Sequence, residues 1–392
     1  MTLTERESQL FFHTYKRLPL EVERGEGCYL FAKDGKKYLD MLSGLAVNAL
    51  GYAHPAVIKA VDEQIRKYGH LSNYFIQEPQ IQLAERLLYH SGFDKIFFTN
   101  SGTEAIEGSV KLVRKWGKPK NKKLIFGMSN GFSGRTMGAL SLMDKEKYRE
   151  GYDPFLPNFG IIEYNNIAEL ESKIDETTAG IFLEFIQGEG GIVSVSSEFV
   201  QKLNELREKF GFLIIADEIQ SGIGRTGRLF GFQHFDFLPD IITIAKPIGG
   251  GLPLGAILGS KKVADVWGYG VHGTTFGGNS ISCAAGIATI DIALTDDFLK
   301  NIVANSAYLF EKLNDLKSRY QVITEIRGFG YMIGIDLKVE STQIVDLMLK
   351  QGVIVNSTAG SVIRILPPLI AGKSEFDQLL QVLENCLKTI SS

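Results

Sequence analysis

Short apolar runs alternate with helical patterns through the middle of the chain, and this alternation restricts the fold more than any other feature. Residues 96–99 have the length and character of a buried strand, and Ile106, Val110 and Val113 then recur at helical spacing. Further runs of strand length follow at 123–126, 181–183, 213–215 and 241–244, with a helical candidate at 198–210. This order predicts an α/β domain with a mostly parallel sheet. Ligands bind such sheets beyond the carboxyl ends of the strands, so polar residues there are the candidate site.

The two ends of the chain differ from its middle. Residues 20–42 predict a hairpin, with strands at 29–31 and 38–40 and a turn at Asp34-Gly35. Beyond about residue 290, helical stretches lead to strands at 332–335 and 361–364. A chain of 392 residues is also too long for one ordinary core. We therefore expect a large domain with a mixed, mostly parallel sheet at 50–290, and a small α+β domain formed by both termini, 1–49 and 291–392.

Composition narrows the classes of function. The chain has 42 Lys plus Arg against 45 Asp plus Glu, and a net charge of −3 gives no basis for binding nucleic acid or an anionic membrane. No apolar run reaches the roughly 18 residues that span a bilayer, and the first residues lack the apolar segment of a signal peptide. The three cysteines are widely spaced and the six histidines have no metal-ligand spacing. A cytoplasmic protein without a bound metal is expected.

Lys246 and Asp217 are the most informative polar residues. Lys246 ends one apolar run and precedes Pro247 and three glycines, whereas Asp217 ends the apolar run at 212–216. A lysine for a Schiff base and an acid for a pyridinium nitrogen are what pyridoxal phosphate (PLP) requires from a protein. Each residue alone has a plainer explanation: a lysine snorkelling from a strand end, and an acid bound to a backbone amide or a metal. Pro247 predicts extended backbone at Lys246.

Two glycine-containing segments are candidate anion sites. Residues 100–104, Asn-Ser-Gly-Thr-Glu, lie between a strand and a helix, where free N–H groups and the helix dipole attract phosphate. The hydroxyls of Ser101 and Thr103 add donors there, although a plain N-cap explains the same residues. Residues 222–227 match G-x-G-x-x-G, but no helical pattern follows them, so the match is weak evidence for a dinucleotide site.

Three more residues are candidates for ligand contacts. Phe132, in a Gly/Ser loop, is either a loop anchor or a stacking partner for a flat ring. Arg135 in the same loop can bind a carboxylate through its two-pronged guanidinium group. Arg364 lies inside an apolar strand, where burial without an anion is costly. The candidate partners for Arg364 are Glu184, Gln187 and Glu189.

Taken together, these segments resemble the class III (subgroup II) aminotransferases of PLP fold type I over nearly the whole chain. The resemblance is carried, in order, by residues 42–48 (Leu-Ser-Gly-Leu-Ala-Val-Asn), 100–105, 187–191 (Gln-Gly-Glu-Gly-Gly), 217–222 (Asp-Glu-Ile-Gln-Ser-Gly), 272–279 (His-Gly-Thr-Thr-Phe-Gly-Gly-Asn) and 364–369 (Arg-Ile-Leu-Pro-Pro-Leu). The chain departs from the usual pattern at Phe185, where proline is common, at Thr103, where alanine is frequent, and at Pro247, where a small residue is usual. None of these departures removes a chemical group from the implied mechanism.

The resemblance implies a role for each matching residue. Lys246 would carry PLP as a Schiff base and move protons, and Asp217 would pair with the pyridinium nitrogen. The other implied cofactor contacts are the phosphate-loop residues Ser101, Gly102 and Thr103, the ring-stacking Phe132 and Ile219, Gln220 at the ring hydroxyl, and Thr275 at the phosphate of a neighbouring subunit. The implied substrate contacts are Tyr15, Arg135, Glu184, Glu189, Thr274 and Arg364.

Within the family, the resemblance is greatest to enzymes that act on N2-acetyl-L-ornithine. It implies transfer of the terminal (δ) amino group to 2-oxoglutarate by a homodimer with shared active sites. Arg364 would bind the α-carboxylate of glutamate, and Glu189 would shield Arg364 while the other substrate is bound. The alternatives are ornithine or succinyldiaminopimelate aminotransferase, another class III ω-aminotransferase or an aminomutase, a nicotinamide dehydrogenase that uses residues 222–227, and a PLP-free binding protein.

Overall fold

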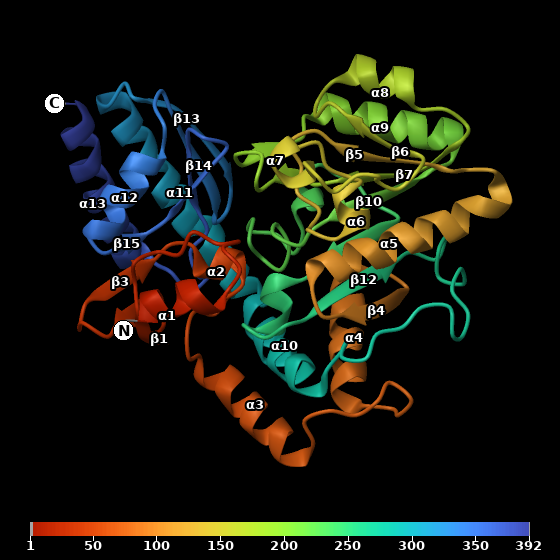
Figure 1. The fold of residues 1–392 in the computed structure, drawn as a ribbon, viewed down its shortest axis with the longest axis horizontal. Coiled ribbons are helices and arrows are strands. Elements are labelled where there is room, and N and C mark those ends of the chain that lie inside the picture. The colour runs from red at the N-terminus through yellow and green to blue at the C-terminus, as the bar shows by residue number, and fades with distance from the viewer. Residues whose placement is uncertain (1–2, 392) are drawn as a thin grey trace.

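The computed structural model describes residues 3–391, and its largest element is a mixed sheet (Figure 1). Within the described residues this sheet has seven strands in the order β4-β12-β11-β10-β7-β5-β6. In chain order they are β4 (Lys95–Thr99), β5 (Leu124–Met128), β6 (Phe159–Ile162), β7 (Thr178–Leu183), β10 (Leu213–Asp217), β11 (Ile241–Ile244) and β12 (Gly255–Gly259). Strand β12 is antiparallel to both of its neighbours, and the remaining pairs are parallel. The strands expected from the apolar runs are confirmed, whereas β6 and β12 were not predicted.

The central strands are continuous Ile- and Leu-rich runs because helices cover both faces of the sheet. Every residue of β7, β10, β11 and β12 is buried. Helix α5 (Gly102–Gly117) packs on one face, and α4 (Glu78–Ser91), α8 (Ile167–Lys173), α9 (Ser197–Phe210) and α10 (Ser280–Ala293) pack on the other. Helix α9, which confirms the helical candidate, begins after Ser196, whose side chain accepts a hydrogen bond from the Phe199 N–H, and ends at left-handed Gly211.

Strands from the two ends of the chain lie side by side next to this sheet (Figure 1). In the described chain, one four-stranded sheet joins β1 (Val22–Glu26), β2 (Tyr29–Ala32) and β3 (Lys37–Asp40) to β15 (Val353–Ile354). A second consists of β13 (Ile323–Phe329), β14 (Met332–Leu337), β17 (Val362–Ile365) and β16 (Asn356–Thr358). Helices α11 (Asp296–Arg319), α12 (Thr342–Lys350) and α13 (Lys373–Ser391) pack with these strands. The β2–β3 hairpin is confirmed; the domain boundaries at 49/50 and 290/291 stay predictions.

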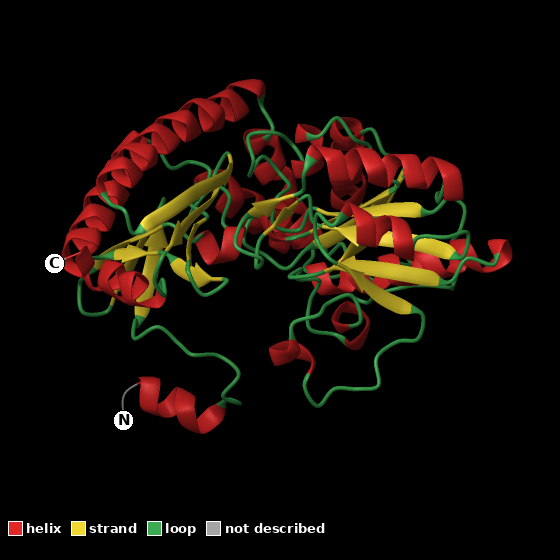
Figure 2. Ribbon diagram, turned by 90° about the horizontal axis from the view of Figure 1, so that it is seen from above, coloured by secondary structure: helices red, strands yellow, loops and turns green. Residues whose placement is uncertain are grey.

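The first helix, α1 (Leu3–Leu10), stands apart from the body of the molecule (Figure 2), and none of its described residues is buried. Helix α3 (Pro55–Lys67) packs against α10. The shorter elements are α2 (Ser43–Ala46), α6 (Met137–Leu140), α7 (Glu146–Arg149), β8 (Ile186–Gln187) and β9 (Val193–Ser194). Over residues 3–391, no helix combines the length and apolar character that crossing a bilayer requires.

Candidate active site

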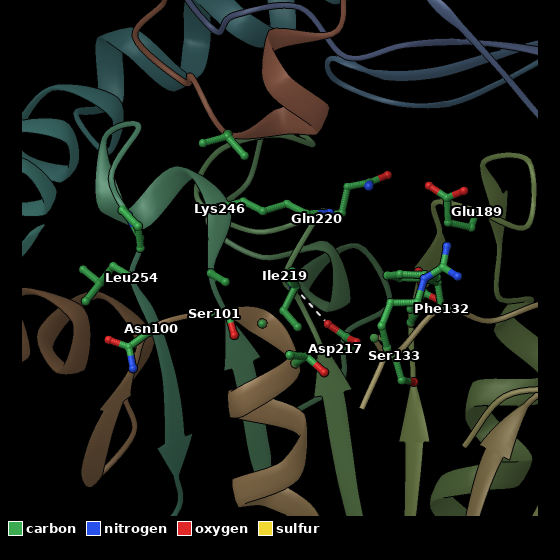
Figure 3. A pocket seen from close by; sticks show the side chains of 18 of the residues that line it. Asn100, Ser101, Phe132, Ser133, Glu189, Asp217, Ile219, Gln220, Lys246 and Leu254 are labelled. Atoms are coloured by element: carbon green, nitrogen blue, oxygen red, sulfur yellow. Dashed lines mark hydrogen bonds between the residues drawn. The ribbon is translucent and has the colours of Figure 1, made fainter. Parts of the chain in front are cut away.

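The polar residues at the carboxyl ends of the strands line one cavity of about 490 Å³, a volume within the range typical of small-molecule sites. Asn100 follows β4, Phe132 follows β5, Glu184 follows β7, Asp217 ends β10 and Lys246 follows β11. Figure 3 shows Lys246 and Asp217 in this cavity, with Ile219 between them in the view. The cavity therefore lies where a mainly parallel sheet binds its ligands.

Lys246 has an unusual backbone conformation. Its φ angle is 52°, and a short 3-10 turn, Lys246–Gly249, starts at this residue. The extended geometry expected from Pro247 is therefore wrong, because the tight turn into the glycines forces left-handed backbone, which is strained for lysine. Burial, together with the charge of Arg364, lowers the pKa of the Lys246 amine to about 8, although nearby acids oppose the shift. Much of this amine is consequently neutral near pH 8 and available as a nucleophile or base.

Asp217 is buried at the end of β10, 7% exposed. Its Oδ1 accepts hydrogen bonds from the Ile219 N–H (3.1 Å) and the Thr243 hydroxyl (3.3 Å). Burial raises the pKa of Asp217 to about 7, and the Ile219 amide and the charge of Lys246 oppose this rise. From residues 3–391, Oδ2 accepts no hydrogen bond. The site thus has a buried acid that a cationic N–H group would satisfy.

The start of α5 closes one end of the cavity. Ser101 is its N-cap, and the Ser101 hydroxyl accepts a hydrogen bond from the Glu104 N–H (3.3 Å). A Cβ atom on Gly102 would lie 2.8 Å from the side chain of Ile219, so a larger residue at position 102 would displace Ile219. The hydroxyl of Thr103 lies 3.1 Å from that of Thr136. Ser101 is therefore an N-cap, as the plainer explanation held, and it also lines the cavity.

Phe132 and Arg135 come from the loop after β5. The Phe132 N–H donates to Glu184 Oε1 (2.8 Å), and Glu184 Oε2 accepts from the Gly188 N–H (3.0 Å). Burial and the charge of Asp217 raise the pKa of Glu184 to about 7. The exposed Arg135 guanidinium lies 3.7 Å from the ring centroid of Tyr148 and 5.5 Å from that of Phe132. Glu184 thus shapes the loop through backbone contacts.

Arg364 on β17 is 1% exposed, and its Nη1 lies 2.5 Å from Glu189 Oε1. Of the three candidate partners for Arg364, Glu189 is the residue that forms this ion pair; Gln187 instead donates to the Ser129 carbonyl. Burial works against the charged form of Glu189, but the charge and hydrogen bond of Arg364 outweigh it and lower the pKa. Gln220 also contacts Arg364, since its Oε1 accepts from Nη1 at 3.4 Å.

Three predicted residues lie away from this cavity. Tyr15 is 72% exposed on the segment after α1, with the Arg17 guanidinium over its ring. Thr275 lines a second, open cavity of about 990 Å³ that also contains Tyr74 and His272. Thr274 lies there as well, although its hydroxyl accepts from the Asn100 amide (3.1 Å) at the edge of the first cavity. A single chain does not bring Tyr15 and Thr275 to Lys246.

Several site residues were not predicted. Asn356 accepts a hydrogen bond from Arg364 Nε (3.1 Å), and Thr243 contacts Asp217. The strand position of Thr243, beside Asp217 in the parallel pair β10–β11, was the available signal. The remaining unpredicted residues that line the cavity are Val47, Ser133, Gly134, Ala245, Gly251, Leu252, Pro253 and Leu254.

The G-x-G-x-x-G match at 222–227 forms turns, and a short 3-10 helix, Gly231–His234, follows later. This is not the strand–loop–helix unit that binds a dinucleotide, which supports the sequence interpretation. Arg225 in this segment is fully buried and donates to the carbonyls of Tyr331 (3.3 Å) and Pro367 (2.5 Å). Burial lowers the pKa of Arg225 to about 9. Through these hydrogen bonds, the segment after Asp217 is joined to the residues next to β14 and to those next to β17, the strand that carries Arg364.

Comparison with known proteins assigns the family. The model of the class III aminotransferases matches residues 11–387. Acetylornithine aminotransferases from Clostridium acetobutylicum and Aquifex aeolicus are 40% and 41% identical to the chain, covering 96% of it and 98% and 99% of their own lengths. The chain belongs to the class III aminotransferase family, and the sequence-based expectation is confirmed.

Solved structures agree with this assignment. An ornithine aminotransferase from Toxoplasma gondii superposes with a TM-score of 0.94 at 28% identity, covering 99% of this chain and 94% of that one. An amine transaminase from an uncultivated Pseudomonas species, solved with PLP bound, gives a TM-score of 0.90 at 27% identity, covering 97% and 98%. The predicted fold, an α/β aminotransferase with a large, mostly parallel mixed sheet, is confirmed. Among residues 3–391, no group of His, Cys, Asp or Glu is arranged to hold a metal ion.

Proposed function

We propose that the protein is a PLP-dependent transaminase of arginine biosynthesis. It transfers the δ-amino group of N2-acetyl-L-ornithine to 2-oxoglutarate and produces N-acetyl-L-glutamate 5-semialdehyde and L-glutamate. The observation that carries the proposal is the buried Lys246 amine sharing one cavity with Asp217 and the Glu189 carboxylate that covers Arg364. The names of relatives about 40% identical over nearly the full chain support this choice of substrate.

The residues of the cavity fit PLP. Asp217 Oδ2, without a hydrogen bond from residues 3–391, suits a protonated ring nitrogen. The free N–H groups at the start of α5, with Ser101, Gly102 and Thr103, suit a phosphate. Phe132 and Ile219 line the space for a flat ring and Gln220 is the proposed partner of its hydroxyl, while Thr275 of a second subunit is the proposed additional phosphate contact.

When bound, PLP supplies an aldehyde for a Schiff base with Lys246 and an electron-withdrawing ring. With PLP bound, the Lys246 amine would be the group that takes a proton from the substrate δ-carbon and returns one in the half-reaction with 2-oxoglutarate. Asp217 would be the residue that pairs with the protonated ring nitrogen, and that cationic partner would favour its ionised form. The apolar side chains of Ile219 and Leu254 line this part of the cavity.

The two substrates differ in the charge they bring to the site. Arg135, Thr274, Tyr15 and Glu184 are the proposed contacts of the acetylated amino acid. Arg364 is the proposed partner of the α-carboxylate of glutamate, which must displace the carboxylate of Glu189. Glu189 covers Arg364 whenever the acetylated substrate is bound, so both substrates can use one cavity.

Glu189→Ala is expected to weaken discrimination between the substrates. Without the competing carboxylate, kcat/KM for glutamate should rise relative to that for N-acetylornithine by about tenfold, because an ion pair no longer has to be broken. Single-substrate half-reactions of the purified enzyme measure both constants. An unchanged ratio would show that Glu189 does not cover Arg364 during the reaction.

Cofactor uptake should depend on the pKa of Lys246. Only the neutral amine attacks an aldehyde, so the rate at which PLP-free protein takes up PLP should rise about tenfold per pH unit and level off above about pH 8. The pKa of Lys246 is lowered from 10.5, so the amine becomes neutral at a lower pH than an exposed lysine does. Stopped-flow absorbance measures the rate. A midpoint near 10.5 would contradict a buried, nucleophilic lysine.

A homodimer with shared active sites is proposed from the exposed apolar residues of two loops. Tyr74 and Thr275 line the same open cavity, and Tyr74, Phe75, Ile76, Tyr269 and Phe276 are all exposed in the single chain. Large apolar side chains exposed in such number on two loops favour a protein interface. Sedimentation should therefore give twice the mass of one chain. Tyr74→Asp should shift the protein toward monomer, whereas Tyr89→Asp, on α4 and similarly exposed, should not.

The test of substrate is a panel of amino donors. N2-Acetylornithine, ornithine, succinyldiaminopimelate and an unacylated ω-amino acid are compared in half-reactions with the purified holoenzyme. The proposal expects the highest kcat/KM for N2-acetylornithine. A preference for free ornithine would favour ornithine aminotransferase, a name that several solved structures of similar fold carry. The cytoplasm remains the proposed location.

A further inference from the structure

Lys145 lies beside the Arg364–Glu189 ion pair, on the segment just before α7. Its Nζ donates a hydrogen bond to the backbone carbonyl of Glu189 (2.8 Å). The Thr358 hydroxyl on β16 donates to the same carbonyl (3.1 Å). The backbone of Glu189 is therefore held from two sides, while its side chain is a quarter exposed and has room to turn.

Breaking the Arg364–Glu189 pair creates an electrostatic problem. A substrate carboxylate on Arg364 would leave the Glu189 carboxylate largely buried without its partner, and a buried charge that loses its partner is strongly destabilising. Gln220, the other neighbour of Arg364, is neutral, and the Lys246 amine is proposed to be engaged with PLP. Binding of the dicarboxylate substrate therefore requires a second cation near Glu189.

Lys145 has the properties of that cation. The ammonium group forms no ion pair within residues 3–391, so it is available to a carboxylate. Burial lowers the pKa of Lys145, and the charges of Glu189, Glu184 and Asp144 act in the opposite direction, as expected for an amine that faces these acids. Its four-carbon stem is flexible, and its Nζ already touches the residue whose side chain must turn.

We propose that Lys145 is a specificity-determining residue that receives the Glu189 carboxylate whenever a substrate carboxylate occupies Arg364. The inference rests on the proposed function, because it assumes that a dicarboxylate and a second substrate alternate in one cavity. Lys145 keeps its hydrogen bond to the Glu189 carbonyl in both states, and it adds an ion pair with the Glu189 carboxylate only when substrate occupies Arg364. It therefore acts on glutamate and 2-oxoglutarate and leaves N-acetylornithine, which is bound with the Arg364–Glu189 pair closed, almost unaffected.

A double-mutant cycle between Lys145 and Glu189 tests the proposal. Lys145→Met should raise the KM for glutamate about tenfold and change the KM for N-acetylornithine less than about twofold, whereas Lys145→Arg should restore most of the loss. In the Glu189→Gln background no carboxylate has to be received, so Lys145→Met should change the KM for glutamate by less than about twofold. A thermal melt of each variant checks that it is folded, and Lys145→Gln replaces Lys145→Met if the latter is not.

A binding measurement separates this proposal from the proposed function. Glutarate, a dicarboxylate without an amino group, is titrated by calorimetry into the native holoenzyme, the two single variants (Lys145→Met and Glu189→Gln) and the double variant. Lys145→Met should raise the Kd for glutarate about tenfold in the native background and less than about twofold in the Glu189→Gln background. The proposal would be overturned if Lys145→Met changed neither the KM for glutamate nor the Kd for glutarate. It would also be overturned if the change persisted in the Glu189→Gln background, or if the KM values for glutamate and N-acetylornithine changed equally. A holoenzyme that binds glutarate in the expected pattern but ignores N-acetylornithine would overturn the proposed function and leave the role of Lys145 intact.

Discussion

Lys246→Ala is expected to lower kcat by about 10⁴-fold or more, because both the covalent attachment of PLP and the proton transfer depend on one amine. The buried position of this amine and its pKa of about 8 are the physical basis of the expectation. Borohydride reduction of the native holoenzyme should trap the cofactor on a peptide that contains Lys246. The variant should give no such adduct, although it should still bind PLP through the remaining contacts of the cavity.

The matched control is Lys261→Ala, which removes an exposed lysine just beyond β12. This variant should keep normal activity and the reducible adduct. An adduct that maps to another lysine in the native enzyme, or a Lys246→Ala protein with near-normal turnover, would remove the basis of the proposed chemistry.

Asp217→Ala is expected to lower kcat by about 10³-fold and to weaken retention of PLP during dialysis. A carboxylate held in a dry site interacts strongly with a ring N–H, and its removal leaves the ring nitrogen without a partner where water cannot replace it. Half-reaction rates and the PLP content of dialysed protein measure the two effects. Normal PLP content together with normal rates would show that Asp217 is only a structural acid.

Glu218→Gln is the matched control, since Glu218 is the adjacent acid and is also buried. Its carboxylate accepts hydrogen bonds from the Ser221 hydroxyl (2.6 Å) and from the N–H groups of Gly231 and Phe232 (2.8 Å each). In the glutamine variant, the side-chain NH2 group would face one of these hydrogen-bond donors and leave it without an acceptor. This should lower the free energy of unfolding by about 1–3 kcal/mol. We expect Tm to fall without a comparable loss of kcat in the folded enzyme.

The sequence allowed us to predict those site residues that lie at the carboxyl end of a buried strand. Asp217 and Lys246 follow apolar runs, and the ends of neighbouring parallel strands meet at the same edge of a sheet. Strand β12 was missed because its segment, 255–259, contains two glycines and follows a glycine-rich loop, so its short apolar core is hidden. Its antiparallel direction depends on tertiary pairing with β4 and β11, which periodicity does not encode.

The residues around Arg364 illustrate a second kind of limit. Burial of an arginine in an apolar strand predicted an anionic partner, but this argument alone left three candidates in one segment. The family resemblance singled out Glu189, and the fold places its Oε1 2.5 Å from Arg364. Asn356 and Lys145 gave no local signal, because their contacts join segments distant in the sequence. The left-handed φ of Lys246 also goes against its local sequence, and such a conformation is maintained by the surrounding packing.

The buried guanidinium of Arg225 has a consequence for motion. Arg225 lies in the loop after Asp217 and donates to two carbonyls: that of Tyr331, just before β14, and that of Pro367, just past the end of β17. The terminal strands therefore cannot tilt without pulling on that loop. Any movement of β17 that shifts Arg364 would therefore also move the loop after Asp217. Under the proposed function, the fit of the substrate carboxylate and the alignment of Asp217 would then change together.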